Sequence, residues 1–325
     1  MNVIFLSGGS GVRLWPLSND VKSKQFLKVL KGPDGIRESM LQRMYRMLKD
    51  VDSNATLTIA TAEQQVDLIK EQLGSGIDMS IEPCRRDTFA AIALSVAYLH
   101  DVKHVNADDV VVVCPVDPLV DREYFEKLNV LYNRAGQANL VLMGIKPTYP
   151  SSKYGYIMVD SNGLVKGFKE KPDEITAAEY IKDGALWNAG VFAFKLQYVL
   201  NKSNELLGYD SYSDLLEHYE ELEKISFDYA VVEHEKDISL EVYDGDWKDL
   251  GTWSTLTESI DKNILGNAVL DSECSNTNVI NELDIPVLGL GLENLVIVAT
   301  KDGILVSEKE ASAGIKNHIK NGNIV

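Results

Sequence analysis

A glycine-rich loop directly after an apolar run near the N-terminus constrains this chain more than any other feature. Residues 3–6 read Val-Ile-Phe-Leu and predict a strand, which runs into Ser-Gly-Gly-Ser-Gly-Val-Arg-Leu at positions 7–14. Glycines let backbone N–H groups approach a phosphate, and Arg13 and Lys24 would add positive charge beside them. The loop has no Gly-Lys-Ser/Thr of a Walker loop, and Leu14 stands where a dinucleotide fingerprint needs its third glycine. It therefore indicates an anion-binding loop of another kind, or a simple tight turn between a strand and a helix.

Strands and helices are expected to alternate through the first half of the chain. Apolar runs predict strands at residues 57–61, 110–114 and 140–145, and helical spacing of apolar residues predicts helices at 38–50, 62–73, 87–99 and 124–135. The run of valines at 110–113 is typical of a parallel strand that is buried on both faces. This alternation predicts an α/β fold with a Rossmann-like, mostly parallel sheet, in which ligands bind at the carboxyl ends of the strands.

The character of the chain changes twice. From Ser151 onward shorter strands, at 156–159, 164–170 and 187–194, are expected to form an inserted, substrate-facing part of the same domain. Beyond Asn263 the sequence consists of short β runs separated by Gly and Asn, closed by a helix. We expect a large domain at residues 1–262 and a small C-terminal β-rich, β-helix-like domain at 263–325.

Charge and cysteine content exclude several classes of function. A formal net charge of −17 argues against a nucleic-acid or anionic membrane partner, because both demand a basic face. An acidic protein that handles phosphates must concentrate positive charge locally or recruit a metal ion. The three cysteines form no C-x-x-C pair, which argues against a thiolate zinc site and favours reduced thiols. With no signal peptide or membrane-spanning run, the cytoplasm is the expected location.

Three carboxylates are predicted to follow strands. Glu82 follows a short extended stretch, Asp117 follows the valine strand, and Asp249 lies in Trp-Lys-Asp-Leu-Gly-Thr-Trp. Each aspartate alone is consistent with a turn or a helix cap. Hard cations prefer carboxylate and phosphate oxygens, so Asp117 and Asp249 together favour a Mg²⁺ site.

A second group of polar residues lies in the inserted part. Glu170 and Lys171 end a predicted strand, which could simply be an edge strand that lysines protect from pairing and that a proline ends. Asn188 could belong to a core strand that a glycine kinks. The functional alternative places Glu170 and Asn188 on sugar hydroxyls and Lys171 on the phosphate of that sugar. Gly155, between two tyrosines, marks either a turn or a place where backbone approaches a ligand.

Eight segments, in this order across nearly the whole chain, resemble the mannose-1-phosphate guanylyltransferase type of the sugar-1-phosphate nucleotidyltransferase family. They are the glycine loop with Lys24-Gln25-Phe26-Leu27, Glu82-Pro83-x-x-Arg86-x-Thr88, Pro115-x-Asp117, Tyr154-Gly155-Tyr156-Ile157, Phe168-x-Glu170-Lys171-Pro172, Trp187-Asn188-x-Gly190-x-Phe192, Ser226-Phe227-Asp228-Tyr229-Ala230 and Trp247-x-Asp249-x-Gly251-x-Trp253. Most of these segments are weak singly, but eight in sequence are a strong signal.

The resemblance implies that residues 1–262 are a catalytic domain that transfers a nucleotidyl group from GTP to mannose-1-phosphate, with Mg²⁺. Arg13 and Lys24 would be the catalytic residues, on the β/γ-phosphates and the α-phosphate, while Asp117 and Asp249 would hold the metal. Glu82 would read guanine through its N1–H and exocyclic amine. The other implied nucleotide-binding residues are Leu6, Gly8, Gly9, Gly11, Arg86, Thr88 and Asp117, and the implied sugar-phosphate-binding residues are Gly155, Glu170, Lys171 and Asn188. A homodimer is expected.

Several positions depart from the family pattern. Val12 stands where threonine is usual, Ser23 where a proline precedes the lysine, and Pro118 where a histidine follows the aspartate. Asp87 and Ala90 replace asparagine and proline in the stretch with which the family reads its base. Two alternatives therefore stay open: the same chemistry on a heptose-1-phosphate or with another NTP, and a sugar-nucleotide-binding regulatory protein without turnover. A dehydrogenase is disfavoured because the chain lacks the third glycine and a Tyr-x-x-x-Lys pair.

Overall fold

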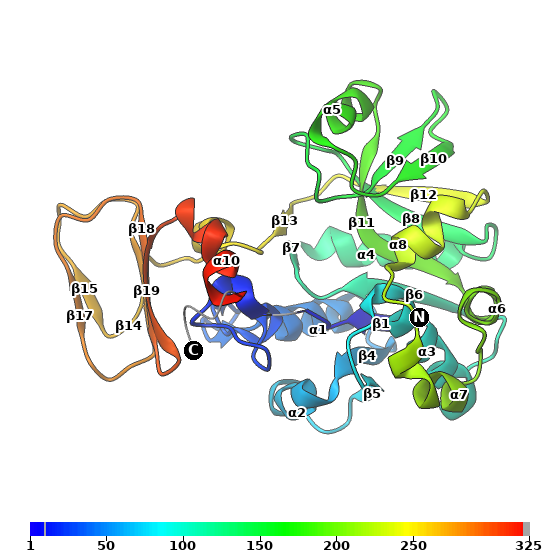
Figure 1. The fold of residues 1–325 in the computed structure, drawn as a ribbon, viewed down its shortest axis with the longest axis horizontal. Coiled ribbons are helices and arrows are strands. Elements are labelled where there is room, and N and C mark those ends of the chain that lie inside the picture. The colour runs from blue at the N-terminus through cyan, green and yellow to red at the C-terminus, as the bar shows by residue number, and fades with distance from the viewer. Residues whose placement is uncertain (10, 321–325) are drawn as a thin grey trace. The chain divides into compact units, whose positions relative to one another are not determined.

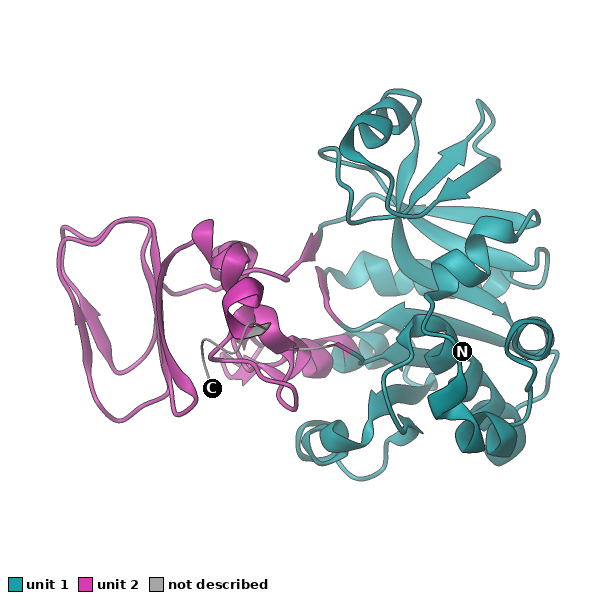
Figure 2. Ribbon diagram, viewed as in Figure 1, with its two compact units in different colours: residues 1–8, 45–116, 120–247 teal, residues 9–44, 117–119, 248–325 magenta. Residues whose placement is uncertain are grey.

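The chain folds into two units that are interleaved along the sequence (Figure 2). Unit 1 comprises residues 1–8, 45–116 and 120–247, and unit 2 comprises residues 9–44, 117–119 and 248–325. This computed structural model describes residues 1–9 and 11–320, so Ser10 of the glycine loop lies outside the described residues. The chain passes from unit 1 to unit 2 for the first time inside that loop, between Gly8 and Gly9.

Unit 1 is built on one large sheet (Figure 1). Its main path runs in the order β10 (Val165–Lys169), β9 (Tyr156–Val159), β11 (Leu186–Lys195), β6 (Val110–Pro115), β1 (Asn2–Leu6), β4 (Thr56–Ala62) and β5 (Asp78–Glu82). In addition, β8 (Leu140–Ile145) pairs with β11, and β12 (Ile238–Tyr243) pairs with β8. Strands β6, β1, β4 and β5 are parallel, whereas β11 joins β6 antiparallel. The predicted Rossmann-like α/β fold is confirmed, and the antiparallel β11 carries the inserted part onto it.

Helices cover both faces of this sheet because side chains alternate along each strand. Ile4, Val111 and Val113 share one buried cluster with residues of α3 (Asp87–Ala97), α6 (Leu196–Leu207), α7 (Tyr212–Glu217) and α8 (Phe227–Ala230). Cys114, on the opposite face of β6, contacts Tyr124 of α4 (Arg122–Arg134). The remaining helices with residues in unit 1 are α1 (Met40–Val51), α2 (Val66–Leu73) and α5 (Glu174–Lys182). No helix within residues 1–9 and 11–320 is long and apolar enough to cross a lipid bilayer.

Unit 2 combines the glycine loop with the C-terminal strands around one core. Leu14 and Leu17 of the loop are buried in the same cluster as Trp253, Val296 and Val298. The elements of this unit are the 3-10 turns η1 (Gly11–Leu14) and η2 (Lys24–Phe26), the hairpin of β2 (Leu30–Lys31) and β3 (Arg37–Glu38), the paired strands β7 (Pro118–Val120) and β13 (Trp247–Asp249), and the helices α9 (Trp253–Glu258) and α10 (Ile315–Lys320).

The C-terminal part of unit 2 is β-rich, as predicted. One sheet has the order β14 (Ile264–Gly266), β16 (Asn278–Asn281), β18 (Leu295–Thr300) and β19 (Gly303–Glu308), and β15 (Ala268–Leu270) pairs in parallel with β17 (Val287–Gly289). Successive short strands pair in parallel, which is the pattern of a β-helix-like coil. The expected domain boundary near residue 262 stays a prediction, and the contacts group residues 263–325 with the glycine loop.

Candidate active site

Lys24 lies between two carboxylates in unit 2. Its Nζ is 2.9 Å from Asp117 Oδ2 and 2.8 Å from Asp249 Oδ1. Lys24 begins η2, Asp117 directly precedes β7, and Asp249 ends β13, so the pairing of β7 with β13 brings the two aspartates together. Burial alone would lower the pKa of Lys24, but Asp117 and Asp249 outweigh it and raise the pKa above its ordinary value. The ammonium is therefore charged at neutral pH, and both carboxylates face one cation.

Arg13 lies near one of these carboxylates, that of Asp249. A Cβ placed on Gly251 would stand 3.0 Å from Asp249 Oδ1 and 3.2 Å from Arg13 Nη1. The backbone at Gly251 thus passes close to both groups, and a side chain there would make tight contacts with them. Arg13 itself is exposed in η1. Two cations and two anions therefore meet at one place in unit 2.

The two aspartates fit a magnesium ion. Both carboxylates lie within 3 Å of one ammonium nitrogen, so both can reach one cation. Within residues 1–9 and 11–320 no group of three or more His, Cys, Asp or Glu side chains is placed to hold a metal. Two carboxylates, completed by substrate phosphate oxygens and water, are a coordination that Mg²⁺ commonly accepts.

The backbone of the glycine loop is partly open. Gly8 and Gly9 are exposed, and Gly9 has a φ of +141°. Gly11 is buried, and its carbonyl oxygen accepts a hydrogen bond from the Ser18 hydroxyl. Leu6 ends β1, where its carbonyl oxygen accepts a hydrogen bond from the Val116 N–H at 3.3 Å. Contact with nucleotide phosphates stays a prediction for these residues.

Glu82 ends β5 in unit 1, and its side chain is buried. Its Oε2 accepts a hydrogen bond of 2.7 Å from the hydroxyl of Tyr219. Burial raises the pKa of Glu82, although the hydrogen bond from Tyr219 acts in the opposite direction. Tyr219 fixes one oxygen of the carboxylate and so sets the direction in which Glu82 can accept from a ligand.

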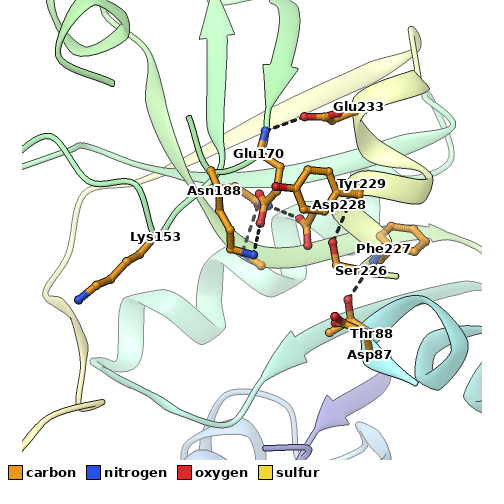
Figure 3. A network of polar contacts seen from close by, with 12 residues as sticks. Asp87, Thr88, Lys153, Glu170, Asn188, Ser226, Phe227, Asp228, Tyr229 and Glu233 are labelled. Atoms are coloured by element: carbon orange, nitrogen blue, oxygen red, sulfur yellow. Dashed lines mark hydrogen bonds and ion pairs between the residues drawn. The ribbon is translucent and has the colours of Figure 1, made fainter. Parts of the chain in front are cut away.

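The side chains of Arg86 and Thr88 form hydrogen bonds at the start of α3. The guanidinium of Arg86 donates to the backbone carbonyl oxygens of Tyr219 and Glu220. The Thr88 hydroxyl accepts a 2.9 Å hydrogen bond from the N–H of Phe227, which begins α8 (Figure 3). Both side chains thus connect α3 to the segment 219–227, and their direct contact with a nucleotide stays a prediction.

A separate polar cluster in unit 1 gathers the expected sugar-phosphate residues. Glu170 Oε1 is 2.7 Å from Lys171 Nζ, and Asn188 Nδ2 donates a 2.6 Å hydrogen bond to Asp228 Oδ1. Figure 3 shows the side chains of Glu170, Asn188 and Asp228 pointing toward one another. A Cβ on Gly155 would stand 2.5 Å from Glu170 Oε2, so the backbone at Gly155 lies against this carboxylate. The four expected residues therefore lie together, with Asp228 as an additional member.

The cluster is crowded with negative charge. Burial and then the neighbouring Glu170 raise the pKa of Asp228 to about 7, although Lys171 favours its charged form. Burial acts to lower the pKa of Lys171, but the Glu170 carboxylate outweighs it and raises the pKa. Lys171 adopts a left-handed backbone conformation with a φ of +45°, which costs free energy for a residue other than glycine.

Sequence reasoning assigned no role to Asp228 or Tyr219. Asp228 lies in a segment that resembles the family, but an aspartate in the first turn of a short helix is also favoured by the helix dipole alone. Its partner Asn188 is 40 positions away, and Tyr219 is 137 positions from Glu82. No local pattern reports contacts over such separations.

Comparisons with known proteins identify the family of this chain. The family model described as Nucleotidyl transferase matches residues 2–264. The chain is 32% identical to mannose-1-phosphate guanylyltransferase of Escherichia coli over 98% of this chain and 74% of that protein. It is also 32% identical to the xanthan biosynthesis protein XanB of Xanthomonas campestris, over 96% of this chain and 71% of that protein.

Among solved structures, the crystal structure described as mannose-1-phosphate geranyltransferase from Thermus thermophilus is similar to this fold. It has a TM-score of 0.81 and 27% identity, and the match covers 99% of this chain and 98% of that one. The family match, the relatives and the fold agree. The chain belongs to the nucleotidyl transferase family and is an enzyme of the mannose-1-phosphate guanylyltransferase-like type.

Proposed function

We propose that this enzyme transfers the guanylyl group of GTP to mannose-1-phosphate, giving GDP-mannose and pyrophosphate, with Mg²⁺ as its metal ion. The observation that carries the proposal is the meeting of Lys24 with Asp117 and Asp249, with Arg13 beside them. With Mg²⁺ on the two aspartates, such a group would carry net positive charge and could neutralise a triphosphate without giving the acidic protein a basic surface. The name of the Escherichia coli relative, a mannose-1-phosphate guanylyltransferase, supports the choice of mannose-1-phosphate and a guanylyl group.

The reaction needs charge neutralisation and alignment rather than a nucleophilic side chain. An oxygen of the sugar phosphate attacks the α-phosphorus, and the bond from that phosphorus to the bridging oxygen breaks as its electron pair leaves with pyrophosphate. No proton has to move, because the attacking phosphate is already ionised. Positioning and electrostatic stabilisation can therefore supply most of the rate enhancement.

Each charged residue then has a distinct role. Arg13 offsets the β- and γ-phosphates, and Lys24 leaves its carboxylate partners for the α-phosphate, where negative charge is redistributed during transfer. Lys171 binds the phosphate of the sugar. Asp117 and Asp249 would hold Mg²⁺, which when bound supplies further neutralisation of the phosphate oxygens.

Glu82 supports guanine as the base. Tyr219 donates to Oε2, which leaves Oε1 to accept from a ligand. Guanine presents two neighbouring donors, N1–H and the exocyclic amine, to such a carboxylate, whereas adenine and cytosine do not offer that pair. A buried acceptor without its donors is costly, so the wrong base is disfavoured.

A substrate grid tests the proposal. Pyrophosphate release is measured with the four ribonucleoside triphosphates against mannose-, glucose- and heptose-1-phosphate in the presence of Mg²⁺. We expect the value of kcat/KM for GTP with mannose-1-phosphate to exceed those of the other pairs by about 10²-fold or more. The Asp249→Asn variant serves as the control for contaminating activity and should fall by roughly 10²–10⁴-fold. A preference for another triphosphate or for the heptose would replace this assignment, and binding without turnover would indicate a regulatory protein.

The homodimer and the cytoplasmic location expected from the sequence stay predictions.

A further inference from the structure

Asp228 has no role in the proposed reaction so far, yet it lies among the sugar-phosphate residues. It belongs to the first turn of α8, while Asn188 comes from β11 and Glu170 follows β10. We propose that Asp228 is a second sugar-recognising carboxylate, and that it and Glu170 accept hydrogen bonds from two neighbouring hydroxyls of the sugar-1-phosphate. This inference rests on the proposed function, since it concerns the sugar of the same reaction.

The charge balance of the cluster is the first argument for this proposal. The ammonium of Lys171 is 2.7 Å from Glu170 and also favours the charged form of the nearby Asp228, so two carboxylates depend on one cation. When Lys171 binds the substrate phosphate, it ceases to be the full partner of Glu170. A buried carboxylate without donors is strongly disfavoured, so new donors have to come from the ligand. Sugar hydroxyls supply such donors.

The hydrogen-bonding groups of Asn188 are largely used within the protein, which is the second argument. Its Oδ1 accepts from the Gly190 N–H at 3.1 Å, and its Nδ2 donates to Asp228 at 2.6 Å. The amide was expected to read the sugar hydroxyls, but its acceptor and one of its two N–H groups are already used within the protein. Asn188 therefore acts mainly as a positioning residue that orients Asp228, and the acceptors available for hydroxyl groups are carboxylate oxygens.

The way in which Glu170 is held in place is the third argument. Its backbone N–H donates to Glu233 Oε1 at 2.9 Å, which holds the backbone, and the Gly155 backbone lies against its carboxylate, which limits the side chain. Asp228 is held by the amide of Asn188 and is close enough to Glu170 for the two charges to affect each other. Two neighbouring acceptors match two neighbouring donors, so the ligand class is a sugar-1-phosphate with a free vicinal diol.

Deoxy analogues of the preferred sugar-1-phosphate, each lacking one ring hydroxyl, test this inference. In the wild-type enzyme we expect two analogues that lack neighbouring hydroxyls to lose about 10-fold or more in kcat/KM. In Asp228→Asn and Asp228→Ala the KM for the parent sugar-1-phosphate should rise about 10-fold or more, while the KM for the triphosphate changes less than about 3-fold. One of the two deoxy penalties should shrink to below about 3-fold in these variants, because the partner of that hydroxyl is gone.

The matched control is Asp108→Asn, which removes an exposed carboxylate of unit 1 that pairs with Lys195 at 3.5 Å. It should leave both KM values and all deoxy penalties unchanged. A merely structural role of Asp228 would lower kcat/KM for the parent sugar and every analogue by the same factor, and that result would overturn the inference. Equal use of all deoxy analogues by the wild-type enzyme would overturn it without any variant.

The two levels of the proposal can fail separately. The deoxy series is built on whichever sugar-1-phosphate the wild-type enzyme prefers, so a preference other than mannose-1-phosphate would overturn the proposed function but not the role of Asp228. Normal turnover of mannose-1-phosphate with an unchanged KM in Asp228→Asn would overturn the role of Asp228 alone.

Discussion

At the scale of single residues, the ammonium of Lys24 is the centre of the proposed catalytic group in unit 2. Lys24 keeps Asp117 and Asp249 close together, although two carboxylates at this spacing would otherwise repel each other. In the proposed function, the same three side chains would provide a pair of metal ligands and an ammonium that moves to a phosphate. The Lys24 side chain is 20% exposed, so its interactions are screened less than those of a surface ion pair.

Replacement of Lys24 by methionine should leave the repulsion between the Asp117 and Asp249 carboxylates uncompensated. We expect Lys24→Met to have a lower Tm than wild type in EDTA, and a larger rise in Tm on addition of Mg²⁺, because a divalent ion can take the place of the missing charge. Thermal unfolding with and without Mg²⁺ measures both effects independently of activity. Lys22→Met is the control, since it removes an exposed pair with Glu282 in the same unit, a kind of pair worth about 0–1 kcal/mol. If Mg²⁺ raised the Tm of wild type and Lys24→Met by the same amount, the two aspartates would not share one ion.

At the scale of elements, the short helix α8 links two functions that the sequence suggested were separate. Thr88 at the start of α3 accepts the N–H of Phe227, the first residue of α8, and Asp228 follows directly. Sequence reasoning placed Thr88 with the nucleotide. In the structure its side chain secures the element that carries a carboxylate of the proposed sugar site.

Thr88→Val separates these two roles because valine has nearly the same shape but no hydroxyl. We expect the KM for the sugar-1-phosphate to rise several-fold and the KM for the triphosphate to change little. The Phe227 N–H would lose its partner, so the free energy of unfolding should also fall by about 1–3 kcal/mol. Thr88→Ser keeps the acceptor and is the matched control. A selective rise in the KM for the triphosphate would instead support Thr88 as a nucleotide ligand.

How far the sequence predicts the molecule depends on the range of the contacts involved. The β1 strand, the valine strand β6 and the alanine-rich α3 follow from local patterns, and the structure has them within a few residues of the predicted bounds. Glu170, Lys171 and Asn188 were also identified as a group. The bonds from Tyr219 to Glu82 and from Asn188 to Asp228 depend on tertiary packing, which no periodicity encodes.

At the scale of the whole molecule, the C-terminal strands are part of the core beneath the glycine loop. Leu14 and Leu17 pack with Trp253, Val296 and Val298, and Thr300 Oγ1 donates to the Pro16 carbonyl oxygen at 3.1 Å. The sequence changes character near residue 262, but that composition change carries no information about which earlier segment the strands pack against. The glycine loop and the residues 263–325 therefore depend on each other for stability.

A truncation after residue 262 tests this dependence. We expect the 1–262 protein to expose the apolar side chains of the loop, to unfold at a lower temperature and to lose affinity for the triphosphate. Thermal unfolding and calorimetric titration with the triphosphate measure these losses, and the full chain is the control. A truncated protein with the wild-type Tm and affinity would show that residues 1–262 are an independent domain, as the sequence alone predicted.

Gly155 and Gly251 each lie close to a carboxylate, which bears on the choice of positions for protein engineering. Each leaves space for a carboxylate of its own unit, Glu170 in one case and Asp249 in the other. Libraries that aim to alter sugar preference should therefore keep Gly155 fixed, because a Cβ there would stand 2.5 Å from Glu170 Oε2, whereas at Gly251 the neighbouring Asp249 carboxylate would have to shift slightly. Diversity is better directed to position 228, where the side chain is part of the proposed recognition surface.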